Sequence, residues 1–264
     1  LQRLESQVAK ARLLLQSGAT EDGRELLRSV AAKLPDETRA ARLQLGLADE
    51  LARMGKWSEA AEEYQVWLDA FAGAPGMAQV LAGRGWALWS DGRPEEAAAA
   101  YAQAVDRETD AARRLELLQK LGDAQFAARR FTQAQTAYAA VLGAAPTGSV
   151  AAARAQLQLA ATELELGETE ADETTTDDLG RAGTDAELGR AAAMRLGALY
   201  EDRGALESAI EQYGRVVEAC AEPEPCAQAL LARGLIRYRM GAFAAAMDDF
   251  TRIRDQLPQT RPAE

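Results

Sequence analysis

Glycines recur along the chain at a nearly constant interval, between segments whose apolar residues have helical spacing. The intervals are 37, 37, 75, 37 and 37 residues, between Gly18, Gly55, Gly92, Gly167, Gly204 and Gly241. The interval of 75 has room for one more unit, in which Arg129 takes the place of the glycine. A self-similar period of this length is typical of solenoid repeats. The pattern therefore predicts seven copies of a helix, a turn and a second helix.

Each copy repeats the same arrangement of small and aromatic residues. A ridge of small and apolar residues precedes the glycine, as in Leu47, Ala48 and Leu51. Five residues after the turn position stands an alanine, and four residues later an aromatic: Ala60 and Tyr64, Ala97 and Tyr101, Ala134 and Tyr138, Ala209 and Tyr213, Ala246 and Phe250. We expect the small residues to let paired helices approach closely and the aromatic to fill the gap between successive hairpins.

The composition favours an all-α fold. The chain holds 59 alanines and only 12 valines and isoleucines, and alanine favours helices whereas β-branched residues favour strands. Proline follows the second helix at Pro35, Pro146 and Pro258, where it ends a helix without breaking it. The fold class predicted is an α-solenoid of about seven helical hairpins, a single domain over 1–264. Its hairpins fall at about 1–37, 38–75, 76–111, 112–148, 149–187, 188–224 and 225–264, of which 149–187 is degenerate.

The charge and the missing residue types exclude several classes of function. Lys and Arg number 30 against 41 Asp and Glu, for a net charge of -11, which disfavours nucleic acid and anionic membranes as partners. No histidine is present, and no phosphate-binding loop or zinc motif occurs, so we expect no enzyme, no cofactor and no metal site. The adjacent Asp248 and Asp249 are expected on a charged outer face. We expect no direct membrane insertion.

One hairpin departs from the pattern and holds most of the negative charge. Residues 163–187 contain ten carboxylates and one arginine, and Asp172 and Thr176 stand where the small and aromatic residues belong. The spacing does not fit a calcium loop. The segment is either a solvated turn or a surface for a basic partner, and residues 168–187 form either a short helix or a mobile loop.

The motifs resemble those of tetratricopeptide repeats. They are carried by Gly55-Lys56-Trp57-Ser58-Glu59-Ala60 with Tyr64, and by Leu196-Gly197, Tyr200, Gly204, Ala209 and Tyr213. The resemblance covers nearly the whole chain and implies a superhelix that binds proteins or peptides on its concave face. The 37-residue period is similar to that of bacterial envelope members of the family, which implies a periplasmic or envelope-associated scaffold. A cytoplasmic protein, a regulatory segment of a larger protein and an oligomerisation module are the alternatives.

By the same resemblance, the first helix of each hairpin lines the concave face. Trp86 and Trp89 share one side of such a helix, and Phe126 holds the place of Trp89 one repeat later. Tyr238 holds it in the last repeat. These rings are either apolar anchors for a partner or packing between helices. The predicted binding residues are Trp86, Trp89, Phe126 and Tyr238, with Arg53 and Lys120 as polar contacts.

The two cysteines, Cys220 and Cys226, flank a proline-containing turn between two hairpins. A structural disulfide between them would fit an oxidising compartment such as the bacterial periplasm. Two free buried thiols are the alternative. A redox role is not expected, because no helix N-terminus with a nearby cation is evident to lower a thiol pKa.

Overall fold

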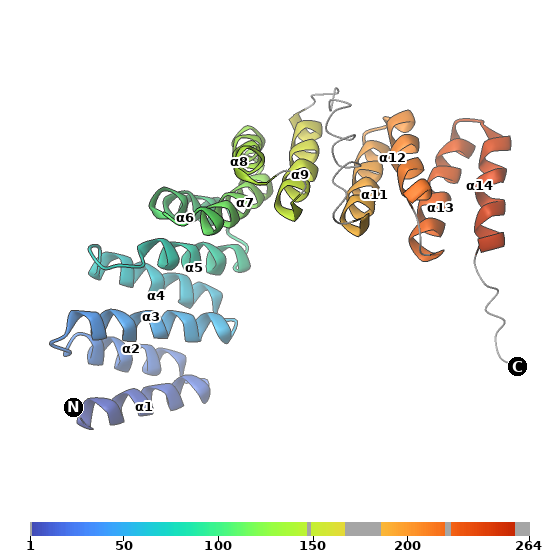
Figure 1. Ribbon diagram of the computed structural model, residues 1–264. Coiled ribbons are helices and arrows are strands. Elements are labelled where there is room, and N and C mark those ends of the chain that lie inside the picture. Colours follow the sequence, from blue (N-terminus) through green and yellow to red (C-terminus); the bar gives the residue numbers. More distant parts are fainter. Residues whose placement is uncertain (1, 147–148, 167–185, 220–222, 257–264) are drawn as a thin grey trace, which may run out of the picture. The chain divides into compact units, whose positions relative to one another are not determined.

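A computed structural model describes residues 2–146, 149–166, 186–219 and 223–256, which form thirteen helices and no strand (Figure 1). The all-α repeat solenoid predicted from the period is confirmed. The helices and their bounds are α1 (Gln2–Gln16), α2 (Thr20–Ala31), α3 (Glu37–Arg53), α4 (Trp57–Ala70), α5 (Met77–Ser90), α6 (Pro94–Arg107), α7 (Ala111–Ala127), α8 (Phe131–Ala144), α9 (Val150–Leu166), α11 (Ala186–Asp202), α12 (Leu206–Ala219), α13 (Pro223–Arg239) and α14 (Phe243–Gln256).

The helices group into two compact units, residues 1–130 and 131–264. In the first unit, α1 with α2, α3 with α4, and α5 with α6 are antiparallel hairpins, and each second helix also contacts the first helix of the next hairpin. In the second unit, α11 with α12 and α13 with α14 pair in the same way, and α9 contacts both α8 and α11. Each hairpin thus buries its apolar face against its neighbours, as solenoid repeats require.

The turn inside each hairpin explains the glycine period. Gly55 follows α3 with a φ of 72°, a left-handed conformation that glycine adopts without a Cβ clash. The next residue, Lys56, donates its backbone N–H to the carbonyl of Leu51, which closes the helix end with the six-to-one bond of a Schellman motif. Arg129, at the glycine position of its repeat, takes the same conformation with a φ of 58°. The following residue bonds back to Gln125 in the same way.

The alanines of the repeat are fully buried, as predicted, and the aromatics make a contact within their own hairpins that the repeat pattern did not predict. A side chain built on a first-helix glycine would lie 2.6–2.7 Å from an aromatic ring in three pairs: Gly85 with Tyr101, Gly197 with Tyr213, and Gly234 with Phe250. Each ring therefore packs on its own hairpin, against the glycine of the first helix. Tyr64 also reaches the next hairpin, where its ring lies against Gly83. The small residue is thus a seat for the ring as well as a means of close approach.

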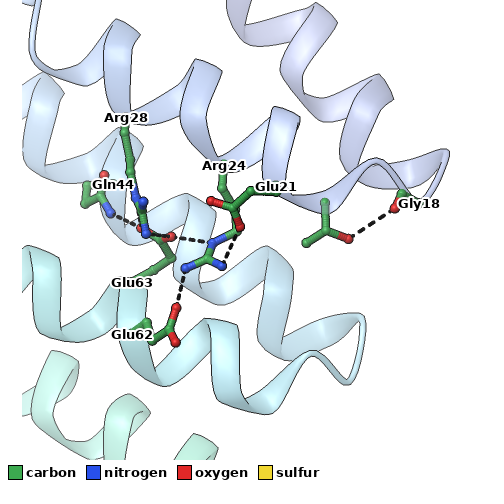
Figure 2. A network of polar contacts seen from close by, with 8 residues as sticks. Gly18, Glu21, Arg24, Arg28, Gln44, Glu62 and Glu63 are labelled. Carbon is green, nitrogen blue, oxygen red and sulfur yellow. Dashed lines mark hydrogen bonds and ion pairs between the residues drawn. The ribbon is translucent and has the colours of Figure 1, made fainter.

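A carboxylate lies fully buried between the first two hairpins (Figure 2). Glu63, on α4, accepts hydrogen bonds from Arg24 at 2.7 Å, from Arg28 at 2.6 Å and from Gln44 at 2.7 Å. Arg24 also donates to Glu62, whose side chain is exposed. Because a buried charge is costly unless it is paired and hydrogen-bonded, these contacts hold α2, α3 and α4 in one arrangement.

A second buried carboxylate corrects the prediction made for Asp249. This residue does not lie on a charged outer face. It is 1% exposed and accepts hydrogen bonds from Arg233 at 2.6 Å and from Arg237 at 2.8 Å. Asp249 stands eight residues after Gly241, the same place that Glu63 holds after Gly55. In both hairpins, the acid at this inward position is therefore stabilised by two arginines.

Candidate partner-binding face

The first helices of the first unit present a stripe of exposed or partly exposed positions with helical spacing, which we call the first-helix face. Its members lie 13, 9, 6 and 2 residues before the turn residue of each hairpin. They are Glu5, Ala9, Arg12 and Gln16 on α1; Arg42, Gly46, Asp49 and Arg53 on α3; Gln79, Gly83, Trp86 and Ser90 on α5; and Glu116, Lys120, Asp123 and Ala127 on α7. Leu47 and Leu51 lie on the opposite, buried side of α3.

Two of the predicted binding residues meet on this face. The side-chain nitrogen of Lys120, on α7, lies 6.0 Å from the ring centroid of Trp86, on α5. Trp86 is 48% exposed, and Lys120 is exposed as well. A cation over an indole face at this distance gains a modest attraction, about 0.5–1 kcal/mol at an exposed site. The Lys120 side chain therefore covers one face of the Trp86 ring. Because this side chain is flexible and weakly held, a bound partner can displace it at little cost.

Trp89 and Phe126 lie on the same two helices but are only partly exposed. Partial burial fits a role in packing between helices, which was one of the two interpretations of these rings. Their contact with a partner stays a prediction. Arg53 is exposed on α3, where it pairs with Glu50 three residues earlier.

Tyr238 belongs to the second unit, in which it lies on α13. It is 59% exposed, and its ring packs edge-on against Phe243 at 5.4 Å between centroids. The five other predicted residues, Trp86, Trp89, Phe126, Arg53 and Lys120, all lie in the first unit.

Two of the four carboxylates on the first-helix face accept a hydrogen bond from a neutral side chain. Asp49 accepts a hydrogen bond from the hydroxyl of Tyr64 at 2.6 Å. Burial and this bond raise the pKa of Tyr64 well above its ordinary value. Asp123 accepts from Gln119 at 3.3 Å. By contrast Arg12, Arg42 and Lys120 make no ion pair within the part of the chain that the structure describes. The first-helix face therefore carries charges of both signs, and Arg12, Arg42 and Lys120 are the cations on it that a partner can pair with.

Of the two cysteines, only Cys226 lies among the residues that the structure describes. Cys226 is buried in the first turns of α13 and is disulfide-bonded. Cys220 and the acidic residues 167–185 lie outside the described residues. The Cys220–Cys226 pairing and the form of residues 168–187 therefore stay predictions.

Metal-binding clusters and membrane-spanning helices are absent from the residues that the structure describes. No three His, Cys, Asp or Glu side chains there come together in a way that could hold a metal ion. None of the described helices is both long enough and apolar enough to cross a membrane.

Comparison with known proteins places the chain among repeat proteins. Residues 8–75 and 45–113 match the model of the tetratricopeptide repeat family. No curated protein matches the sequence. The match and the shared fold support a tetratricopeptide repeat protein, and residues 8–113 carry the family's own pattern.

Solved structures show the same fold at low sequence identity. The C-terminal part of a tetratricopeptide repeat protein from Cytophaga hutchinsonii superposes with a TM-score of 0.63 at 15% identity, over 96% of each chain. A tetratricopeptide repeat protein from Parabacteroides merdae superposes with a TM-score of 0.55 at 20% identity, over 98% of this chain and 95% of the other. The apo form of RapI gives 0.61 at 13% identity, over 96% of this chain and 76% of its own.

The sequence did not point to the buried arginine–carboxylate groups. A signal for them exists, because Glu63 and Asp249 stand one residue before the repeat aromatic, where Ala100 and Ala137 are buried in other hairpins. An acid at a place that carries buried alanine in other hairpins, together with arginines on neighbouring helices, predicts a buried ion pair.

Proposed function

We propose that the protein is a protein-interaction scaffold whose first unit binds a segment of a partner on the first-helix face. Proteins of this repeat class are generally non-catalytic scaffolds. The observation that carries the proposal is Trp86, a large aromatic side chain left half exposed in the middle of a face that also offers cations. Tryptophan is the residue type most enriched among side chains that dominate binding energy.

The mechanism follows from the stacked helices. The first-helix face is built on paired helices, of which α3 and α5 are packed on both sides, so it needs little ordering when a partner binds. A partner's apolar side chain displaces the Lys120 ammonium from the Trp86 ring and covers the indole. Lys120 then becomes free to pair with an acid of the partner next to that apolar group.

A selection from random peptides tests the proposal. Immobilised protein is offered a phage library of random 12-residue peptides, in parallel with the Trp86→Ala variant. The matched control is Leu13→Ala, which removes another side chain of the first unit that is 65% exposed but lies off the first-helix face. The proposal expects related peptides with the native protein and with the control, and none with Trp86→Ala. Equal selection by all three proteins would contradict it.

The cellular setting is a separate part of the proposal. We place the protein in a bacterial envelope complex, most simply in the periplasm, and the disulfide at Cys226 supports this because such bonds persist in oxidising compartments. Thiol alkylation of the protein in intact cells of its source tests the assignment. Two alkylated thiols without prior reduction would favour the cytoplasmic alternative.

The last hairpin supports a second candidate, association with a second copy. Six large apolar side chains are exposed among its described residues: Leu231, Leu235, Tyr238, Met240, Phe243 and Met247. Met247 is 63% exposed, whereas Ala61 and Ala98, at the same place in internal hairpins, are buried. Light scattering across a concentration series tests this candidate. A mass that rises with concentration and falls back in Phe243→Ser supports it, and a constant monomer mass excludes it.

A further inference from the structure

A small pocket opens on the first-helix face between α1 and α3. Its volume is about 40 Å³. Buried leucines form its apolar wall: Leu15, Leu27 and Leu47. Arg12 and Arg42 also line it, one from each first helix. A water molecule needs roughly 10–15 Å³ of such space, so the pocket has room for about three waters or for one planar group of carboxylate size.

The repeat register explains why the pocket is open. Arg12 stands six residues before its turn, the place that Trp86 holds on α5. Gly46 stands nine residues before its turn, the place from which Lys120 covers Trp86. Because Gly46 has no side chain, nothing fills that place here, and a Cβ built on it would meet no atom within 4 Å. The cover present between α5 and α7 is therefore missing between α1 and α3.

The charges around the pocket are unbalanced in favour of cations. Arg12 and Arg42 are exposed, and neither has a carboxylate partner among the described residues. Glu50 also lines the pocket, but its carboxylate is paired with Arg53. Two guanidinium groups therefore meet one carboxylate that is already neutralised. Guanidinium groups bind carboxylates through parallel N–H···O bonds, a geometry that an ammonium group does not offer.

We infer that the pocket between α1 and α3 binds a carboxylate side chain, and that partners of the first-helix face are acidic segments. The statement about partners rests on the proposed function, whereas the pocket's preference for a carboxylate does not. A planar carboxylate fits this small volume better than a tetrahedral phosphate group, which has one more terminal oxygen. The acid is a side chain within the segment, so neither chain terminus of the partner is needed.

The first experiment uses a small probe and the full chain. N-acetyl-L-glutamic acid α-amide is titrated while the Nε–Hε resonances of the arginines are followed by NMR, and N-acetyl-L-glutamine amide serves as the uncharged control. We expect saturable shifts of Arg12 and Arg42 with the acid only. Arg12→Gln and Arg42→Gln should each weaken binding about tenfold or more, since each removes one side of a charge-assisted pair. The matched control, Arg113→Gln, removes an exposed arginine of the same unit outside the pocket and should leave binding unchanged.

Three results would overturn the inference: equal shifts with the amide, shifts spread over all exposed arginines, or tighter binding of inorganic phosphate than of the acid. The Trp86→Ala variant should bind the probe as the native protein does, so loss of the Trp86 site does not affect this readout.

The second experiment addresses the acidic partner. A 12-residue peptide selected by the native protein, blocked at both ends, is compared with its Glu→Gln and Asp→Gln versions. We expect about tenfold weaker binding for one substituted position, with that difference abolished in Arg12→Gln/Arg42→Gln. If the substitutions have no effect, the acidic-partner inference is wrong although the scaffold proposal stands. If no peptide is selected at all, the scaffold proposal fails, and the small-probe titration still decides the pocket.

Discussion

The seating of an aromatic ring on a first-helix glycine gives the sharpest prediction about stability. Gly85 and Gly46 both lie inside first helices, in α5 and α3, so alanine at either site improves helix propensity by about 1 kcal/mol. Their surroundings differ. A Cβ on Gly85 would lie 2.7 Å from the ring of Tyr101, whereas a Cβ on Gly46 would meet nothing within 4 Å.

The expected effects therefore have opposite signs. Overpacking of this kind costs about 1–3 kcal/mol, because the ring or the helix must move. Gly85→Ala should lower the free energy of unfolding by up to about 2 kcal/mol after the propensity gain, and Gly46→Ala should raise it by about 1 kcal/mol. Because the Tyr101 ring is what a Cβ on Gly85 would meet, Gly85→Ala in a Tyr101→Leu background should lose most of its cost.

Urea unfolding followed by far-UV circular dichroism measures both variants. Repeat proteins can unfold in more than one step, so the midpoints and slopes of each transition are compared with those of the native chain. Equal stabilisation by Gly85→Ala and Gly46→Ala would refute the ring-seating account. So would a cost at Gly85 that persists unchanged without the Tyr101 ring.

Three further perturbations test other parts of the structure. Glu63→Gln leaves two arginines without their buried carboxylate and should cost about 3–5 kcal/mol of stability in urea unfolding. Glu62→Gln, at the exposed end of the same group, should cost less than about 1 kcal/mol. Equal costs would mean that burial of the ion pair is unimportant. Burial, with Glu201 nearby, raises the pKa of Tyr213 to about 12 from an ordinary value of 10.0. The unfolded chain loses the Tyr213 hydroxyl proton at a lower pH than the folded chain, so the free energy of unfolding falls as the pH rises from about 10 through 12. Tyr213→Phe should reduce that fall by up to about 2–3 kcal/mol. An unchanged dependence of stability on pH would contradict the raised pKa of Tyr213. Cys226→Ser should lower stability by roughly 2 kcal/mol relative to the oxidised protein, as measured by thermal unfolding. Its stability should match that of the reduced native protein. No difference from the oxidised protein would exclude the disulfide.

The repeat fold could be predicted from sequence because its signals are local and periodic. A turn glycine such as Gly55, followed five residues later by Ala60, fixes both the helix end and the buried small position. Even Arg129, which breaks the glycine pattern, was placed correctly by the interval alone and takes the left-handed conformation. Seven repetitions of a weak signal make a strong one.

Contacts between helices were harder to predict from the sequence, because they depend on which side chains of neighbouring helices lie opposite one another. Asp249 looked like a surface acid, since nothing in its own helix reveals that Arg233 and Arg237 face it. The packing of the aromatic rings on glycines of their own hairpins was missed for the same reason. Tyr64 differs from Tyr101 because its glycine lies in the next hairpin rather than in its own.

The candidate face was predicted in part. The family resemblance selected the first helices, and the sequence picked out Trp86 and Lys120, which the structure brings together. The pocket beside Arg12 was not foreseen, because it arises from a missing side chain at Gly46 and from two arginines on different helices. A pattern of charged and aromatic residues in the sequence does not show where a missing side chain opens a pocket.

The most direct test of the scaffold account is the affinity of a selected peptide for three proteins, measured by fluorescence anisotropy with the peptide labelled. Trp86→Ala should weaken binding at least about thirtyfold, as expected for an anchor worth 2 kcal/mol or more, while Leu13→Ala leaves it within twofold. Circular dichroism should show both variants as helical as the native protein, since both side chains are exposed. Native affinity in Trp86→Ala, or an equal loss in Leu13→Ala, would contradict the claim that the first-helix face binds the partner.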